Sequence, residues 1–266
     1  GIGADQARDL VADALRQGDP ASGVPTLDQL RAPFLLDDLR HVREALGVHQ
    51  WLVVGGSWGA TLAVVHAAAE PQAVSALLLR SAFLARHEDI DWFFQGAAAE
   101  QPQAWQRLAS IAQQDERGAL LPCLQRMLRE GTAAQQQQAA LAWWQWEQAL
   151  AGTAASPPSQ DNMPALIDRY RVQSHYLAHG CFLDTRALLH RCNDVPRVPT
   201  LLIHGRADRV CRAEGATLLQ SALPGSHVQW LDGVGHDAAH PAMQAAMTRA
   251  LNHYAAHTRF DAVALA

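Results

Sequence analysis

The sequence has no long hydrophobic run. No apolar stretch approaches the roughly 18 to 20 residues that a helix needs to span a bilayer. Residues 1–9 also lack the basic and then apolar plan of a signal peptide. We therefore expect no membrane partner and a cytoplasmic location.

Clustered positive charge is absent as well. The chain has 21 basic and 26 acidic residues, a formal net charge of -5, and its basic residues occur singly or in pairs. A stripe of basic side chains that could follow a phosphate backbone is therefore missing, and we expect no nucleic-acid partner.

Cysteine is scarce, and neither cysteine nor histidine occurs in a metal-binding pattern. The four cysteines lie at long spacings without a CxxC pair, which fits neither a zinc site nor a dense disulfide framework. The thirteen histidines include no HExxH motif, so we expect no metal and no other cofactor. We expect free thiols at Cys123, Cys181, Cys192 and Cys211.

The chain does show an alternation of strand-like and helix-like segments. It has 266 residues, of which 49% are apolar, enough to bury a core in one or two compact units. Apolar residues at helical spacing predict helices at 5–16 and 27–46. Short apolar runs at 51–54 and 76–79, separated by a helical stretch at 61–69, predict two buried parallel strands joined by a helix.

The same alternation returns near the end of the sequence. Residues 200–203 and 228–231 are predicted strands, and each precedes a predicted helix, at 213–222 and 242–255. This order of elements predicts a doubly wound α/β sheet with helices on its faces.

A long helical insertion separates the two halves. Residues 84–196 contain almost no strand pattern and include helical segments at 104–114 and 134–150. We interpret them as a helical cap. The two parts of the α/β core are then 1–83 and 197–266.

The strongest chemical signal is the GGSWG motif around Ser57. It follows a predicted strand and precedes a predicted helix, which is the context of the nucleophile elbow of α/β-hydrolases. We expect Gly55 and Gly59 to be needed because side chains there would collide with backbone in so tight a turn. The alternative is an ordinary serine in a glycine-rich turn.

An acid and a base follow two later strands. Asp208 comes after the strand at 200–203, and His236 comes after the strand at 228–231. The order Ser, Asp, His is that of α/β-hydrolases. Asp208 could instead cap a helix and His236 could be an ordinary loop histidine. Two further acids, Asp232 and Asp237, also compete for the acid role.

Several longer motifs run from about Leu36 to the last helix. They are GGSWGATLA, LRSAFL followed by DWFF, AWWQWE, the His175-Tyr176 pair, HGRADRVC and GVGH. Together they resemble the prolyl aminopeptidases, or proline iminopeptidases, of the α/β-hydrolase superfamily. It implies that the substrate-binding residues are Phe83, Trp146, Glu147 and Gln173.

The resemblance implies release of an N-terminal proline, or a similar small residue, from a small peptide or amide. The cap would read the free amine. A buried ammonium needs a carboxylate to offset its desolvation, and Glu147 could supply one. The alternative is an exposed helix glutamate, with the tryptophans forming the core of the cap.

The sequence departs from this family in two places. Gln173 and Ser174 stand where the family has an acidic residue and Asn, so one of the charges that would hold the amine is absent. Residues 1–3 do not continue into the family's early motifs, and its His-Gly-Gly-Pro oxyanion loop does not occur. We expect a partial chain that lacks the first strands of the sheet.

The expected mechanism is acyl transfer. Ser57 attacks the carbonyl, His236 passes the proton to the leaving amine, and Asp208 orients the imidazolium. The backbone N–H of Trp58 is one oxyanion donor. The alternatives are an esterase or amidase acting on small acyl substrates, and a partial hydrolase without catalytic activity.

Overall fold

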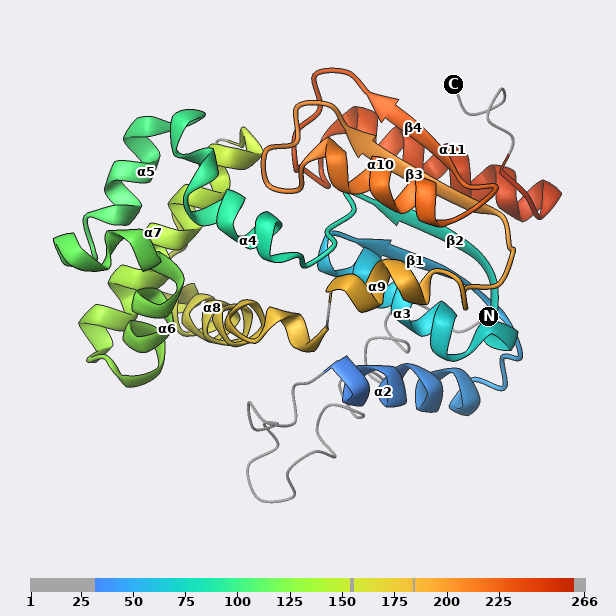
Figure 1. The fold of residues 1–266 in the computed structure, drawn as a ribbon, viewed down its shortest axis with the longest axis horizontal. Coiled ribbons are helices and arrows are strands. Elements are labelled where there is room, and N and C mark those ends of the chain that lie inside the picture. Colours follow the sequence, from blue (N-terminus) through green and yellow to red (C-terminus); the bar gives the residue numbers. More distant parts are fainter. Residues whose placement is uncertain (1–31, 154–155, 184, 261–266) are drawn as a thin grey trace.

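The fold is built on one parallel β-sheet (Figure 1). The computed structural model describes residues 32–153, 156–183 and 185–260. The predicted helix at 5–16 and the start of the one at 27–46 lie outside these residues. The strands, in their order across the sheet, are β1 (Trp51–Gly56), β2 (Val74–Arg80), β3 (Thr200–Gly205) and β4 (His227–Leu231).

The central strands are continuous apolar runs because both of their faces are covered. Leu78 of β2 pairs with Leu201 of β3, and Leu79 pairs with Leu202. All four of these leucines are at most 2% exposed. The predicted strands and their parallel pairing are thus confirmed.

Helices cover both faces of the sheet. Leu77 and Leu79 point into one apolar cluster with Val64 and Leu219, whereas Leu78 points into another on the opposite face. The first face carries α3 (Trp58–Ala69), α10 (Ala213–Ala222) and α9 (Thr185–Arg191), with α2 (Ala32–Ala45) packed against α3. The opposite face carries α11 (Pro241–His257).

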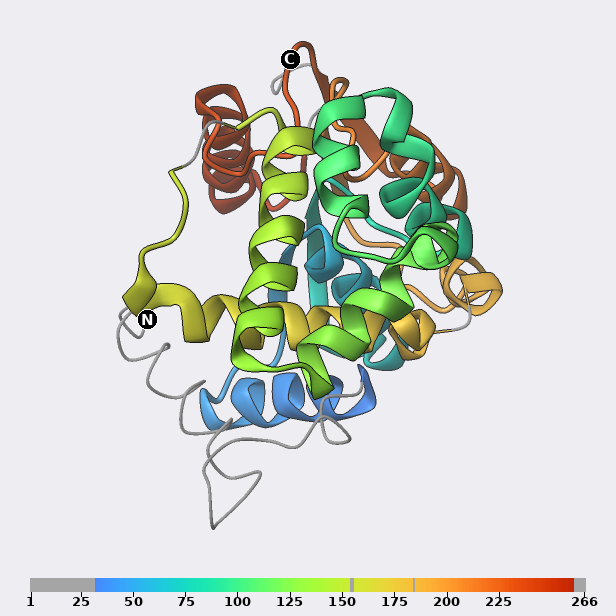
Figure 2. The ribbon, with the colours of Figure 1, turned by 90° about the vertical axis from the view of Figure 1, so that its left-hand side faces the viewer.

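A group of helices between β2 and β3 lies beyond the carboxyl ends of the strands (Figure 1), and Figure 2 shows it in front of the sheet. The five α-helices of this group are α4 (His87–Phe94), α5 (Pro102–Ala109), α6 (Leu120–Glu130), α7 (Ala133–Ala151) and α8 (Met163–Ala178). Short 3₁₀ turns are η1 (Pro71–Ala73), η2 (Gly96–Ala99), η3 (Gln114–Ala119), η4 (Gln160–Asn162) and η5 (Gly180–Phe182).

No helix in the described part of the chain is long and apolar enough to cross a membrane.

The helix α7 is the longest of this group and has clear signals at both ends. Thr132 and Gln135 form a capping box, in which each side chain accepts a hydrogen bond from the other's backbone N–H. The helix ends at Gly152, which has φ 71, a left-handed conformation that suits glycine. Trp143 in its middle is fully buried and stacks on Tyr170 of α8 with ring centroids 5.0 Å apart.

We propose that the cap comprises α4 to α8. These helices share an apolar cluster of their own. By contrast, Leu188 on α9 and Cys192 just after it are buried in the cluster that contains Leu77 and Leu79 of the sheet. The cap predicted from the sequence ends at residue 196, whereas our proposal assigns α9, the last helix of that segment, to the core.

Candidate active site

Ser57 lies in a strained turn between β1 and α3. Its backbone has φ 55 and ψ -124, a conformation that non-glycine residues adopt only when the surrounding structure holds them there. A Cβ on Gly55 would lie 2.3 Å from the carbonyl oxygen of Gly59, so glycine is required at position 55. The predicted steric need at Gly59 is wrong, because a Cβ there would meet nothing within 4 Å. Gly59 instead supplies the carbonyl that residue 55 must clear.

Asp208 and His236 are directly hydrogen-bonded. Nδ1 of His236 lies 2.8 Å from Oδ2 of Asp208, whose side chain is fully buried. Oδ1 accepts the backbone N–H groups of Val210 at 3.0 Å and Cys211 at 2.8 Å. Residues 206–212, the acid loop, therefore fix the carboxylate in one orientation.

The two competing acids have other partners. Asp232 is 90% exposed and pairs with Arg206 at 2.9 Å. Asp237 accepts the backbone N–H of Ala239 at 2.8 Å. The geometry therefore favours Asp208 as the partner of the histidine.

The thiol of Cys211 lies close to the serine and interacts with the histidine. Its Sγ is 3.8 Å from Oγ of Ser57, and it also interacts with the His236 side chain. Burial raises the pKa of Cys211, while the contact with His236 lowers it by less. Burial would lower the pKa of His236, but Cys211 and Asp208 together raise it above its usual value.

A second histidine supports the acid loop from the sheet. His204, at the end of β3, is fully buried, and its Nε2 lies 2.9 Å from the carbonyl oxygen of Cys211. Burial lowers the pKa of His204, which favours a neutral ring. A neutral ring has one N–H, and the carbonyl can accept it.

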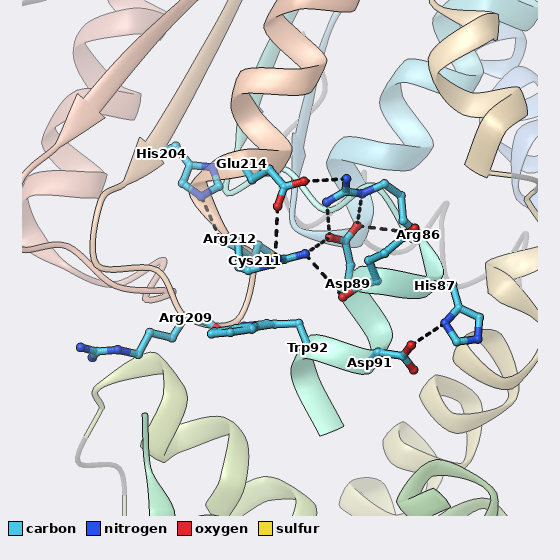
Figure 3. Close-up of polar contacts among 11 residues, drawn as sticks. Arg86, His87, Asp89, Asp91, Trp92, His204, Arg209, Cys211, Arg212 and Glu214 are labelled. Atoms are coloured by element: carbon cyan, nitrogen blue, oxygen red, sulfur yellow. Dashed lines mark hydrogen bonds and ion pairs between the residues drawn. The ribbon is translucent and has the colours of Figure 1, made fainter. Parts of the chain in front are cut away.

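A group of ion pairs connects the acid loop to the cap (Figure 3). Asp89 on α4 pairs with Arg86 at 2.7 Å and with Arg212 of the acid loop at 3.4 Å. Glu214 pairs with both arginines, at 2.9 and 3.2 Å. The guanidinium of Arg212 also lies over the Trp92 ring, 5.2 Å from its centroid. The start of the cap is thereby fixed to the loop that holds the acid.

A cavity of about 660 Å³ lies between the sheet and the cap. Ser57, Cys211 and His236 line it on the sheet side. Glu147 on α7 and Gln173 on α8 line it on the cap side. Most of the other lining residues are apolar, so the site combines a nucleophile, a base and a largely apolar chamber.

Two more of the predicted site residues line this cavity, and one does not. Phe83 and Trp58 are part of the lining. Trp146 is fully buried within the cap, where its Nε1–H donates to the carbonyl oxygen of Phe93 at 2.9 Å. Its predicted role in substrate binding is therefore wrong: successive helical positions point about 100° apart, and Trp146 faces the core while Glu147 faces the cavity.

Glu147 is buried and has three side-chain partners. Its Oε2 accepts hydrogen bonds from Tyr170 at 2.7 Å and from Arg169 at 3.0 Å, and its Oε1 accepts one from Gln173 at 2.8 Å. Burial, together with the nearby carboxylate, raises the pKa of Tyr170, so the phenol remains a donor. The alternative of an exposed glutamate is wrong, since Glu147 is 8% exposed, although the tryptophans do form the cap core.

Sequence reasoning missed Arg169 and Tyr170. Arg169 and Gln173 are four residues apart on α8, so they lie on one face of that helix. This spacing could have joined them into one group. It could not have shown that the group faces Glu147, because that depends on how α7 and α8 pack.

We predict that a bulky thiol reagent inactivates the protein through Cys211. An adduct would fill the cavity beside Ser57 and displace the backbone N–H that holds Asp208. Inactivation is expected to be slow because Cys211 is 4% exposed. Residual hydrolysis against time with a maleimide, followed by mass spectrometry of the modified peptide, measures this effect.

The matched control is Cys181, a second buried cysteine that lines the same cavity. Burial raises its pKa to about 12 and also raises the pKa of Cys211, so little thiolate is present at either position, and the two single variants show which adduct inactivates the protein. The Cys181→Ser variant should be inactivated like the parent, and Cys211→Ser should be protected. If Cys211→Ser were inactivated as fast as the parent, the reagent would not act through Cys211.

Comparison with known proteins gives a consistent result. Residues 15–241 match a family model described as alpha/beta hydrolase fold. The chain is 33% identical to a proline iminopeptidase of Xylella fastidiosa, over 78% of this chain and 68% of the relative. It is 33% identical to one of Xanthomonas citri, over 83% and 72%, and 34% identical to one of Arabidopsis thaliana, over 79% and 57%.

Solved structures share the fold at low sequence identity. An alpha/beta hydrolase called MGS-M2, from a Medee basin deep-sea metagenome library, has a TM-score of 0.53 and 16% identity, covering 90% of this chain and 76% of that one. The structure of VinJ has a TM-score of 0.53 and 17% identity, covering 86% and 74%.

Proposed function

Because the chain belongs to the α/β-hydrolase family, and within it to the proline iminopeptidases, we propose that it is a serine hydrolase that releases N-terminal proline or a similar small residue. The observation that carries the proposal is the hydrogen-bonded Asp208–His236 pair, which lies at the same cavity as the strained Ser57 turn. A nucleophile, a base and an acid that orients the base are the groups that acyl transfer needs.

In the proposed reaction, Ser57 attacks the substrate carbonyl and His236 accepts the serine proton. The imidazolium then protonates the leaving amine, while the buried carboxylate of Asp208 holds its Nδ1–H. The backbone N–H of Trp58, the first residue of α3, is the proposed oxyanion donor. Water afterwards hydrolyses the acyl-enzyme by the same proton transfers in reverse.

The cap side of the cavity is the proposed site of the substrate amine. Glu147 is the carboxylate there, and it is 8% exposed. An ammonium that leaves water for an apolar chamber needs such a partner, since an unpaired buried charge is costly. The apolar lining is suited to the pyrrolidine ring. The nucleophile, Ser57, lies on the sheet side of the same cavity.

We predict that Glu147→Gln lowers kcat/KM for a prolyl amide about 10²-fold, while an uncharged ester of similar size changes by less than about threefold. The reason is that the variant removes the charge that offsets desolvation of the amine and keeps the shape of the site. Steady-state kinetics on the two substrates measure the difference. An equal loss on both would mean that position 147 does not read the amine.

Gln173→Glu is the complementary change. Its Nε2 lies 2.8 Å from Oε1 of Glu147, so a second carboxylate there would stand beside the first. Two close carboxylates repel each other unless a cation binds between them. We expect the variant to shift preference toward prolyl amides. An unchanged ratio of the kcat/KM values for the prolyl amide and the ester would mean that position 173 does not contact the amine.

A further inference from the structure

We propose that Arg169 is a specificity-determining residue that occupies, in the free protein, the place on Glu147 that the substrate amine takes. This inference rests on the proposed function, because it concerns the same cavity. Arg169 reaches Oε2 of Glu147 at 3.0 Å and itself lines the cavity. The amine must therefore compete with a cation that the chain supplies.

The hydrogen-bonding capacity of Glu147 is nearly used. A carboxylate offers about four lone-pair sites. Arg169 and Tyr170 take two on Oε2, and Gln173 takes one on Oε1. An ammonium with its several N–H groups finds about one site remaining unless a present partner leaves.

The charge of the cavity points the same way. In the part of the chain that the structure describes, the carboxylates lining the cavity are Glu147 and Asp89. Asp89 is paired with Arg86 and Arg212, and Glu147 is paired with Arg169. Each carboxylate is therefore already paired with a cation of the chain, and neither is free to attract an amine.

Arg169 is the partner that can leave. Its side chain is 58% exposed, whereas that of Glu147 is 11% exposed and Tyr170 is fully buried. The guanidinium can swing into water and be hydrated there, while the phenol has no such route. Amine binding then exchanges one ion pair for another, so its net gain is smaller than that of filling an unpaired site.

The consequence is a weakened requirement for a charged amine. The apolar walls bind the ring of the acyl group whether or not it carries a charge. Arg169 competes with the amine for Glu147 and so reduces the extra binding free energy that a charged ring would gain over an uncharged one. The substrate class that follows is amides of small cyclic acyl groups, with prolyl amides favoured only modestly over uncharged ones. Removing Arg169 should sharpen the preference for prolyl.

The test compares two anilides that differ at one atom. Prolyl and cyclopentanecarbonyl anilides have rings of the same size, and only the first carries an ammonium. We expect Arg169→Gln to raise the ratio of their kcat/KM values, prolyl over cyclopentanecarbonyl, by about tenfold. Arg169→Lys retains a cation and should leave the ratio near that of the parent.

The matched control is Arg171→Gln, the same substitution two residues further along α8. Arg171 contacts Asp168 and the carbonyl oxygen of Leu128, not Glu147. Its ratio should equal that of the parent. An unchanged ratio in Arg169→Gln, or an equal rise in Arg171→Gln, overturns the proposal.

Binding measurements separate this proposal from the proposed function. Kd values for prolinamide and cyclopentanecarboxamide are measured by calorimetry with Ser57→Ala, alone and combined with Arg169→Gln. A rise in relative prolinamide affinity supports the role of Arg169 even if neither anilide is hydrolysed, in which case the proposed activity fails. Hydrolysis without a shift in either ratio leaves the activity standing and removes Arg169 from it.

Discussion

Replacing Ser57 with alanine should abolish hydrolysis and labelling by a fluorophosphonate probe. Loss of the nucleophile in a serine hydrolase lowers kcat by about 10⁶-fold when the other groups remain. The probe reacts with a serine only where a base can take its proton, and Ser57 lies at the cavity that contains His236. Gel fluorescence after labelling and steady-state kinetics measure both effects.

The matched control is Ser81→Ala. Ser81 also follows a strand directly and has positive φ, 47, but it is fully buried. Its hydroxyl accepts one long hydrogen bond, 3.5 Å, from Arg80. This variant should still be labelled. Both variants should melt cooperatively, and labelling that persists in Ser57→Ala would refute the assignment of the nucleophile.

Asp208→Asn should lower kcat by about 10⁴-fold, because it changes which ring nitrogen of His236 carries the proton. The backbone N–H groups of Val210 and Cys211 both donate to Oδ1, so an asparagine must place its oxygen there. Its NH₂ group then faces Nδ1 of His236. That nitrogen must accept instead of donate, and the ring proton moves to Nε2, where it prevents the ring from acting as a base.

The pH dependence provides a separate measurement. The base must be neutral, so kcat/KM falls as pH drops through the pKa of His236. The folded protein raises this pKa above 6.5, so the acid limb should have its midpoint above that value. Removing the charge of Asp208 removes one cause of the rise, and the midpoint should move to lower pH in Asp208→Asn.

Asp237→Asn is the control for this pair of measurements. Asp237 is adjacent to His236 in sequence, but its carboxylate accepts the backbone N–H of Ala239. Its kcat and its acid limb should match those of the parent. A large loss in Asp237→Asn, with Asp208→Asn near normal, would reverse the assignment of the acid.

The cap explains why the acid loop has one defined position. The ion pair of Arg212 with Asp89 fixes the loop from the cap side. Glu214 on α10 pairs with the same arginine, and His204 bonds to the loop from the sheet side. Buried or partly buried networks of this kind hold a site more strictly than single exposed pairs. The orientation of Asp208 therefore depends on elements that are distant in sequence.

The sequence alone determined the sheet and the three residues proposed for catalysis. The short apolar runs at 76–79 and 200–203, each placed beside a helical stretch, predicted buried strands, and both were found. The positions of Ser57, Asp208 and His236, each just past a strand, predicted a common site, because carboxyl ends of parallel strands meet at one edge. That inference needs local pattern and one rule of topology, and no side-chain packing.

Only the tertiary structure decided the environment of these residues and the chemistry of the cap. Trp146 and Glu147 are adjacent in sequence, yet one lies in a core and the other at a cavity. The pairing of Glu147 with Arg169 joins residues 22 apart on two helices, and the thiol of Cys211 lies beside a serine 154 residues away. Helical period fixes which residues share a face, but the neighbour of that face is set by how the helices pack, which a single sequence does not encode in any local pattern.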